Sequence, residues 1–283
     1  FEETEKQAIK LEQWLANQPE VQGYASFVGD GAPRFYLSLD QKFVQSNLAE
    51  LIVIPKTFED REILRGKLKE HLENNFPDIR PRITLLPNGP PVTYPVQFVV
   101  QGPDPRVVRV VADQVKEAVA SSEYTRGTHD NWNENIKVMK VEVDQARARA
   151  LGVSSQSIAE SSHVILSGAT IGQYRENNRL IDIVFRNPES ERDTLAELMN
   201  ANVPTASGAY VPLSQVGKVT MSFEPGVIWR EGGEFGITVK ADVVSGIQGT
   251  TVALAMNKAL DPLRSELPLG VSVNLDGLAA DSG

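Results

Sequence analysis

The sequence predicts an α+β protein built from two split βαβ units, the second interrupted by an inserted α+β segment. Three observations support this prediction. An amphipathic helix followed by a strand recurs four times along the chain. A stretch rich in glycine and proline, NGPPVTYPVQFVVQGPDP at 88–105, separates the cycles into two pairs. Residues 136–226 have a different pattern and lie between the two halves of the second pair.

The first predicted unit occupies residues 1–88 and contains two helices. Leu11 and Leu15 lie on one face of the first helix, and Thr57 is a candidate N-cap for the second. We expect its elements in the order helix, strand, strand, helix, strand, at 2–17, 21–28, 34–40, 59–75 and 82–86. The opening strand that a split βαβ unit requires is missing from the sequence.

The second predicted unit combines residues 89–135 with 227–283. The prolines at both ends of 88–105 restrict the backbone, so the strand between them opens a new sheet. The expected strands are 92–100, 125–131, 227–243 and 271–275, and the expected helices begin at 105 and cover 250–265. In the insert we expect strands at 137–144, 180–186 and 209–213 and helices at 145–150, 154–166 and 195–200.

The composition argues against several classes of protein. The net charge of -9 disfavours a nucleic-acid partner, because phosphate contacts need a basic face. The absence of cysteine removes disulfides, thiolate catalysis and cysteine metal sites. The apolar run at 51–54 is far shorter than the ~20 residues that span a bilayer. Because the chain starts directly on a helix pattern without methionine, we expect it to be part of a longer protein.

No catalytic constellation is visible in the sequence. His71, His129 and His163 are far apart, and His129 lies beside Asp130 in a polar link. No phosphate-binding loop or dinucleotide fingerprint occurs. The four methionines fall in different predicted elements, which fits core packing better than a copper or silver site: Met139, Met199, Met221 and Met256. We therefore expect no enzymatic activity, no catalytic residue, no cofactor and no functional metal site.

Four motifs follow one another along the chain. They are Gly89-Pro90-Pro91 with 95–98 and 102–104, the run 141–144 leading into 148–154, the run 210–216, and Ile228-Trp229-Arg230-Glu231-Gly232. In this order they resemble the second large periplasmic loop of resistance-nodulation-division (RND) multidrug efflux transporters, with the best fit to the acriflavin-resistance branch. The resemblance covers essentially the whole chain.

The resemblance implies two ferredoxin-like porter subdomains and one inserted docking subdomain. Residues 1–88 are similar to the first porter subdomain without its opening strand, and 89–135 with 227–283 are similar to the second. Residues 136–226 are similar to the inserted docking subdomain. The family is trimeric, lies in the bacterial inner membrane and exports amphiphilic drugs by proton influx, with a periplasmic adaptor and an outer-membrane channel as partners. The resemblance thus implies a periplasmic part that guides substrate and docks, without a role in energy transduction.

The resemblance also implies a substrate cleft between the two porter subdomains. The matching positions are Phe27, Arg34, Tyr36, Tyr94, Val96 and Phe98. Alternation along a strand at 92–100 puts Tyr94, Val96 and Phe98 on one face, which we expect to border the cleft. The alternative is that these side chains belong to the core, above all Phe98.

One feature departs from the family pattern. In the family's drug pumps a long aromatic loop between two strands of the first porter subdomain gates the passage. The predicted turn here is short, at 29–33, which argues against such a gate.

Three other classes stay open from sequence. A metal-exporting member of the same superfamily is the closest, and a relative that moves lipid or protein is the next. An independent enzyme is disfavoured, because no nucleophile–base pair is visible.

Overall fold

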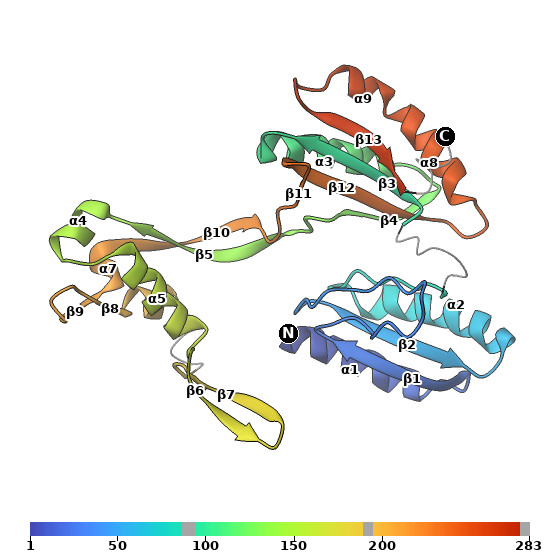
Figure 1. The fold of residues 1–283 in the computed structure, drawn as a ribbon. Coiled ribbons are helices and arrows are strands. Elements are labelled where there is room, and N and C mark those ends of the chain that lie inside the picture. The colour runs from blue at the N-terminus through green and yellow to red at the C-terminus, as the bar shows by residue number, and fades with distance from the viewer. Residues whose placement is uncertain (87–93, 189–194, 278–283) are drawn as a thin grey trace. The chain divides into compact units, whose positions relative to one another are not determined.

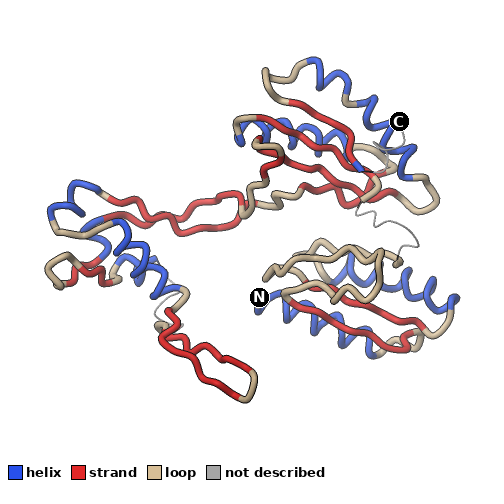
Figure 2. Tube along the Cα trace, in the orientation of Figure 1, coloured by secondary structure: helices blue, strands red, loops and turns tan. Residues whose placement is uncertain are grey.

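The computed structural model describes residues 1–86, 94–188 and 195–277. The chain divides into two compact units. The first unit combines Phe1–Asn131 with Trp229–Gly283, and the second unit is Trp132–Ile228. Figures 1 and 2 show their helices and strands. No helix in the described ranges is both long and apolar enough to cross a membrane.

The amino-terminal half of the first unit is a two-stranded antiparallel sheet with two helices. Its elements are α1 (Glu2–Ala16), β1 (Val21–Val28), β2 (Ala49–Pro55) and α2 (Phe58–Asn75). β1 pairs with β2, α1 packs against β1, and α2 packs against β2 (Figure 1). The Thr57 hydroxyl accepts a hydrogen bond from Asp60 N at 3.0 Å, which confirms the predicted N-cap of α2.

The predicted strand at 34–40 is wrong. Residues 29–48 connect β1 to β2 and contain no strand, so the partner of β1 is the apolar run that starts at Ala49. Alternating apolar residues suggested a strand, but Phe35 and Leu37 are 57% and 80% exposed. Alternation indicates a strand only where the segment pairs within a sheet, and residues 34–40 pair with no strand.

The other half of the first unit is a single larger antiparallel sheet. It contains β3 (Val96–Gly102), β4 (Thr125–Asp130), β11 (Arg230–Glu231), β12 (Glu234–Val243) and β13 (Ser272–Asp276). The strand order is β11-β12-β3-β13, and β4 also pairs with β12. The helices are α3 (Pro105–Ala120), α8 (Gly249–Ala259) and α9 (Asp261–Ser265).

One face of this sheet forms the core. Along β3 buried and half-exposed residues alternate, with Val96, Phe98 and Val100 fully buried. Both α3 and α8 pack against β3 and β12, so the helices cover this face. The apolar stripe predicted for α3 is confirmed, since Val108, Val111 and Val115 are buried.

The predicted strand at 82–86 is also wrong, and the second half explains why. There the closing strand β13 pairs with β3, the strand that precedes α3. No strand precedes α1 in the described residues, so 82–86 lacks the equivalent partner and has no regular secondary structure. A strand is stable only when its backbone groups are paired.

The second unit begins with a long two-stranded ribbon, β5 (Asn135–Val143) and β10 (Gly217–Pro225), which the sequence predicted only on the β5 side. Its other strands form two hairpins, β6 (Ala169–Glu176) with β7 (Arg179–Phe185) and β8 (Asn202–Pro204) with β9 (Tyr210–Pro212). The helices are α4 (Gln145–Ala150), α5 (Ser155–Leu166), α6 (Leu195–Met199) and α7 (Leu213–Val216). Ile158, Leu198, Val203, Leu213 and Val216 are among its core residues.

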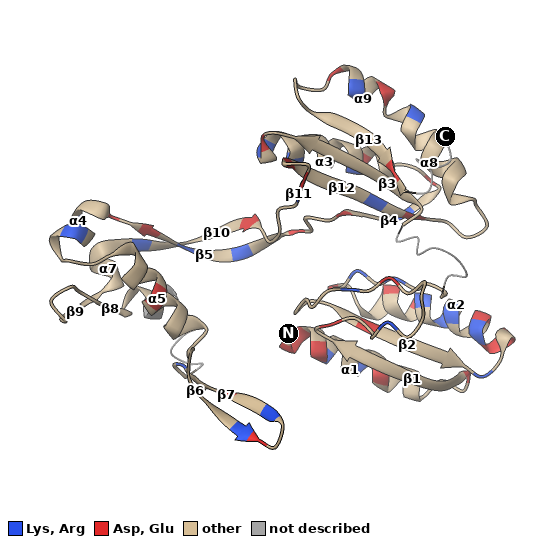
Figure 3. Cartoon of the chain, viewed as in Figure 1, with Lys and Arg blue, Asp and Glu red and all other residues tan. Residues whose placement is uncertain are grey.

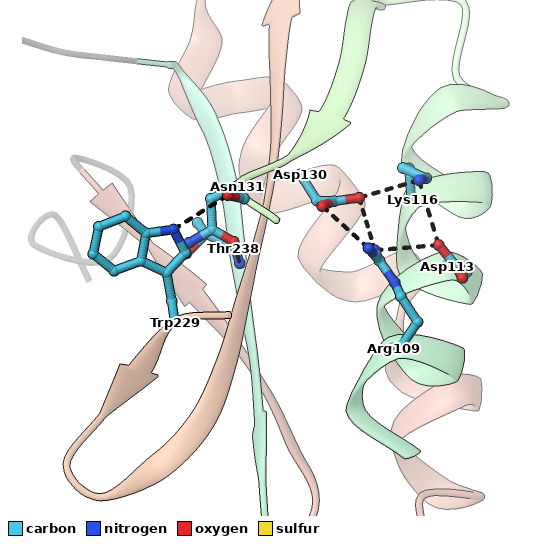
Figure 4. Close-up of polar contacts among 7 residues, drawn as sticks. All are labelled: Arg109, Asp113, Lys116, Asp130, Asn131, Trp229 and Thr238. Atoms are coloured by element: carbon cyan, nitrogen blue, oxygen red, sulfur yellow. Dashed lines mark hydrogen bonds and ion pairs between the residues drawn. The ribbon is translucent and has the colours of Figure 1, made fainter. Parts of the chain in front are cut away.

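Figure 3 shows charged residues along α1 and α2 and also on strands and connections of the chain. Two carboxylates of the described residues are buried, Glu20 at 7% and Asp130, at the end of β4, at 2% exposure. The Asp130 carboxylate accepts hydrogen bonds from Arg109 Nη2 at 2.7 Å and from Lys116 Nζ at 3.1 Å, both on α3 (Figure 4). Burial alone would raise the pKa of Asp130, but the hydrogen bonds and charges of Arg109 and Lys116 outweigh burial and lower it.

The next residue, Asn131, ties the end of β4 to β12 and to Trp229. Asn131 Oδ1 accepts a hydrogen bond from Thr238 N of β12 at 2.9 Å, and Asn131 N donates to Thr238 O at 3.1 Å. Trp229 Nε1 donates to Asn131 O at 3.2 Å (Figure 4). The two points where the chain leaves and re-enters the first unit are therefore linked to each other and to β12.

The Asp130 network predicts a specific loss of stability. Asp130→Asn leaves two cations facing a neutral amide and should lower the free energy of unfolding by about 2–4 kcal/mol at pH 7. Because the folded-state pKa of Asp130 is lowered, its stabilisation is present above the unfolded pKa of about 3.9 and is lost as pH falls through the folded value. Urea unfolding of both proteins between pH 3 and pH 7 measures this difference.

Asp113 provides the matched control. It pairs with the same Arg109 and Lys116, but its side chain is 52% exposed. Asp113→Asn should therefore cost less than about 1 kcal/mol. Equal losses for the two variants, or a loss at Asp130 that does not shrink at low pH, would contradict the assignment.

Candidate functional site

The face of the larger sheet that is not covered by helices is polar. Along β12 the half-exposed Thr238, Lys240 and Asp242 alternate with buried residues. Gln97 on β3 lies opposite Lys240 in the strand register. Because the buried residues face α3 and α8, these polar side chains lie on the opposite, open face.

Four side chains meet at this face, and we call them the Tyr94 cluster: Arg82, Tyr94, His129 and Asp242. The Arg82 guanidinium lies 3.9 Å from the centroid of the Tyr94 ring. Its Nε and Nη2 donate to the two carboxylate oxygens of Asp242 at 2.8 and 2.9 Å. The His129 ring meets the Tyr94 ring edge-on, with 4.7 Å between centroids. The cluster thus joins the segment after α2, which carries Arg82, to Tyr94 just before β3, to His129 of β4 and to Asp242 of β12.

The backbone of β4 explains why His129 faces Tyr94. Successive side chains of a strand point to opposite faces, and Asp130 points to α3. His129 therefore projects onto the open face. The pairing with β12 shifts register between Lys240 and Asp242, and Gly127 adopts a left-handed φ of +59° at this irregularity. Nδ1 of His129 lies 2.7 Å from Gly127 O, which requires the proton on Nδ1.

Partial burial shifts three protonation equilibria here. Burial raises the pKa of the Tyr94 hydroxyl and lowers the pKa of the His129 imidazole. Burial also lowers the pKa of Lys240, and the charge of Lys42 lowers it further. At pH 7 the cluster therefore holds a neutral tyrosine, a neutral histidine and one Arg–Asp ion pair.

Two charged residues of the connection at 29–48 influence groups on this face of the sheet. The charges of Asp40 and Lys42 act on Lys240, and that of Asp40 also acts on Tyr94. The same connection exposes four large apolar side chains, between 57% and 80%: Phe35, Leu37, Phe43 and Val44. The prediction of a short turn at 29–33 is therefore wrong, because the link between β1 and β2 is long and aromatic.

The structure separates the six predicted cleft residues into two groups. Val96 and Phe98 are fully buried in the core, so their assignment to a ligand-facing surface is wrong. The other four are at least partly accessible. Phe27 is half-buried near the end of β1, and the exposed Arg34 hydrogen-bonds to Leu37 O in the connection.

Tyr36 and Tyr94 are the two tyrosines among the predicted residues. Both are half-buried. The hydroxyl of Tyr36 is buried without a hydrogen-bond partner in the part of the chain that is described. Tyr94 belongs to the cluster, and it is joined there by residues that sequence reasoning assigned no binding role: Arg82, His129 and Asp242. The alternation of polar and apolar residues along β12 indicates a polar sheet face. No pattern in the sequence indicates that Asp242 meets Arg82.

The site offers recognition groups of several kinds. It combines aromatic rings, one ion pair and an exposed apolar connection. Within the described ranges, no group of three or more His, Asp or Glu side chains is arranged to hold a metal ion. Groups of these kinds make contacts with molecules that have both apolar and charged parts.

Comparison with known proteins places the chain in a family. Residues 1–282 match the AcrB/AcrD/AcrF family. The cobalt-zinc-cadmium resistance protein CzcA of Cupriavidus metallidurans is 24% identical over 178 residues, which are 60% of this chain and 17% of that protein. The swarming motility protein SwrC of Bacillus subtilis is 23% identical over 138 residues, which are 49% of this chain and 13% of that protein.

Solved structures show the same fold. Two crystal forms of a heavy metal efflux pump superpose with TM-scores of 0.73 and 0.74, at 17% and 18% sequence identity. Each match covers 99% of this chain and 30% of the pump. This chain therefore spans less than a third of the proteins it is compared with. Since the family match covers nearly its whole length, the chain belongs to the AcrB/AcrD/AcrF family of RND transporters.

Proposed function

We propose that this chain is the periplasmic porter and docking region of a proton-driven inner-membrane pump that exports amphiphilic drugs. Residues 1–88 and 89–135 with 227–283 form two ferredoxin-like porter subdomains, and 136–226 form the docking subdomain. The full transporter is a homotrimer that works with a periplasmic adaptor and an outer-membrane channel. The chain has no enzymatic activity of its own, and its role is to guide substrate and to dock.

The observation that supports this cargo is the connection at 29–48. It carries exposed aromatic and aliphatic side chains, and the charge of its Asp40 acts on Tyr94 of the cluster. An amphiphile presents an apolar body and a polar or charged end, and the connection and the cluster offer one partner each. The short turn predicted at 29–33 argued against a gating loop. The long aromatic connection at 29–48 is instead suited to act as such a gate.

Metal-ion export is the second candidate. It is favoured by relatives whose names refer to cobalt, zinc, cadmium and heavy metals. One pair of methionines also supports this candidate, because Met139 of β5 lies directly opposite Met221 of β10. Met139 packs against the core of the second unit, while Met221 is 42% exposed. Two thioethers suit a soft metal in kind, but core packing explains Met139 as well.

The drug-export proposal predicts that the connection carries binding energy. Phe35 and Phe43 are 57% and 77% exposed, so serine at both positions removes apolar contact without opening the core. Losing one such contact costs roughly 1.5–3 kcal/mol of binding, or about tenfold or more in affinity. In the full transporter, the double variant should lower the minimal inhibitory concentrations of amphiphilic drugs at unchanged protein abundance.

Phe58→Ser is the matched control for this experiment. Phe58 is 65% exposed at the start of α2 and lies outside the connection. It should leave drug resistance unchanged. If the connection variant also leaves resistance unchanged for every compound, the proposed role of the connection is refuted.

Calorimetry distinguishes the two cargoes. Titration of this chain with Zn²⁺, Co²⁺ or Cu⁺ should give no saturable binding in the micromolar range if the cargo is an amphiphile. Binding at a defined stoichiometry that Met221→Leu abolishes would replace the proposal with metal export. This variant keeps the volume and apolar character of the side chain, so a loss of binding reports on the thioether.

A further inference from the structure

The base of the connection at 29–48 contains an aspartate followed by a glycine. Asp30 is exposed, and its carboxylate Oδ1 accepts a hydrogen bond from Gly31 N at 2.8 Å. Because Oδ1 is bonded to Cγ, this contact holds the Gly31 nitrogen close to the carboxyl carbon of Asp30. A nitrogen and a carbonyl carbon held together in this way react far more readily than the same groups in a mobile chain.

We infer that Asp30–Gly31 is a site of spontaneous covalent modification, at which the chain closes a succinimide ring and then opens it as isoaspartate. This inference goes beyond the proposed function, because export of a substrate requires no such step. It needs no enzyme and no cofactor, since both reacting groups belong to the chain and water is the only other reactant.

The reaction has two balanced steps. In the first step the Gly31 nitrogen loses its proton to solvent and bonds to Cγ of the protonated Asp30 side chain, and the Cγ–OH bond breaks to release water. In the second step water adds to the main-chain carbonyl carbon of Asp30, and its bond to the Gly31 nitrogen breaks. The main chain then runs through Cβ and Cγ of Asp30. One water is lost and one is gained, and nothing is oxidised or reduced.

Packing at Gly31 keeps the reacting nitrogen unhindered. A Cβ atom added to Gly31 would lie 2.7 Å from Cβ of Lys42, which is closer than real Cβ atoms come to other atoms. The position therefore requires glycine, and a glycine has no side chain to shield its nitrogen from the neighbouring carboxyl group.

Hydrogen bonds fix both ends of this dipeptide but leave its central amide free of strand pairing. Gly29 N donates to Leu48 O at 2.8 Å, and Ala32 N donates to Glu50 Oε2 at 2.6 Å. The Gly31 N–H between them bonds to the adjacent carboxylate instead. No sheet has to open before the ring closes, so folding does not protect this peptide.

The chain contains the same dipeptide in a protected setting. Asp276 is the last residue of β13 and lies opposite Gln97 of β3. A Cβ atom on the following Gly277 would lie 2.9 Å from Gln97 Nε2. Ring closure there has to pull the end of a strand away from the sheet. The two Asp–Gly pairs thus differ through the fold alone, which makes Asp276–Gly277 an internal control.

The modification changes how the connection is attached. Isoaspartate inserts one methylene into the main chain just before Ala32, which is 2% exposed and bonded to Glu50 of β2. The added length moves Ala32 relative to Glu50 and weakens this hydrogen bond, because donor and acceptor must meet in a narrow range of distance and angle.

The test follows isoaspartate in the 283-residue chain during incubation for several weeks. Protein isoaspartyl methyltransferase measures the total, and peptide mapping with Asp-N protease, which does not cleave at isoaspartate, locates it. Asp30 should react in the folded chain as fast as in guanidinium chloride. Asp276 should react at least about tenfold more slowly when folded, because β13 must open first. The rate at Asp30 should rise from pH 8 to pH 5, since only the protonated carboxyl group releases water.

Asp30→Glu is the matched variant. It keeps the carboxylate but lengthens the side chain, so ring closure would need a six-membered ring and is slow. The variant should remove isoaspartate from this peptide and leave Asp276 unchanged, and circular dichroism confirms that it is folded. Hydrogen–deuterium exchange at the Ala32 amide should become faster after incubation of the wild type but not of Asp30→Glu.

Two results would overturn the inference. One is a folded chain in which Asp30 reacts as slowly as Asp276, and the other is isoaspartate confined to Asn88–Gly89, which reacts by loss of ammonia. Isoaspartate that forms at Asp30 at the rate of the unfolded chain, and is absent from Asp30→Glu, establishes the site whatever the resistance measurements on the connection show.

Discussion

The pairing of β12 with its neighbouring strands is the interaction on which the first unit depends. β12 hydrogen-bonds to β3, to β4 and to β11, and its buried residues Ile237, Val239 and Ala241 face the helices. Its other residues, Thr238, Lys240 and Asp242, form the open face. Because side chains alternate along a strand, one register sets both the core and the candidate site. A shift by one residue would bury Lys240 and Asp242 and expose the core.

The same alternation connects stability to recognition at the end of β4. Asp130 is buried against Arg109 and Lys116 of α3, and this places the preceding His129 beside Tyr94 on the opposite face. The following residue, Asn131, bonds to Thr238 and receives the indole N–H of Trp229. Three consecutive residues therefore contact helix α3, support the Tyr94 cluster and link the end of β4 to Trp229 and β12.

Two Arg–Asp pairs in this unit differ in burial and therefore in what breaking them costs. The Arg109–Asp130 pair lies beneath α3, where breaking it leaves uncompensated charge and is costly. The Arg82–Asp242 pair lies at the surface, where water screens it and exchange is cheap.

The sequence by itself determined the local elements and the family. Leucine and valine spacing located α1, α2 and α3, Thr57 marked a helix start, and motif order indicated the transporter family before any comparison. These features depend on residues close together in the chain. The strands at 34–40 and 82–86 were wrong because strand formation needs a partner, and partners are distant in sequence. Only the tertiary structure turned Val96 and Phe98 into the core and brought Arg82 to Asp242, 160 residues away. Which face of a strand is buried depends on where its helices pack, and which charges meet depends on how the sheet folds against the rest of the unit.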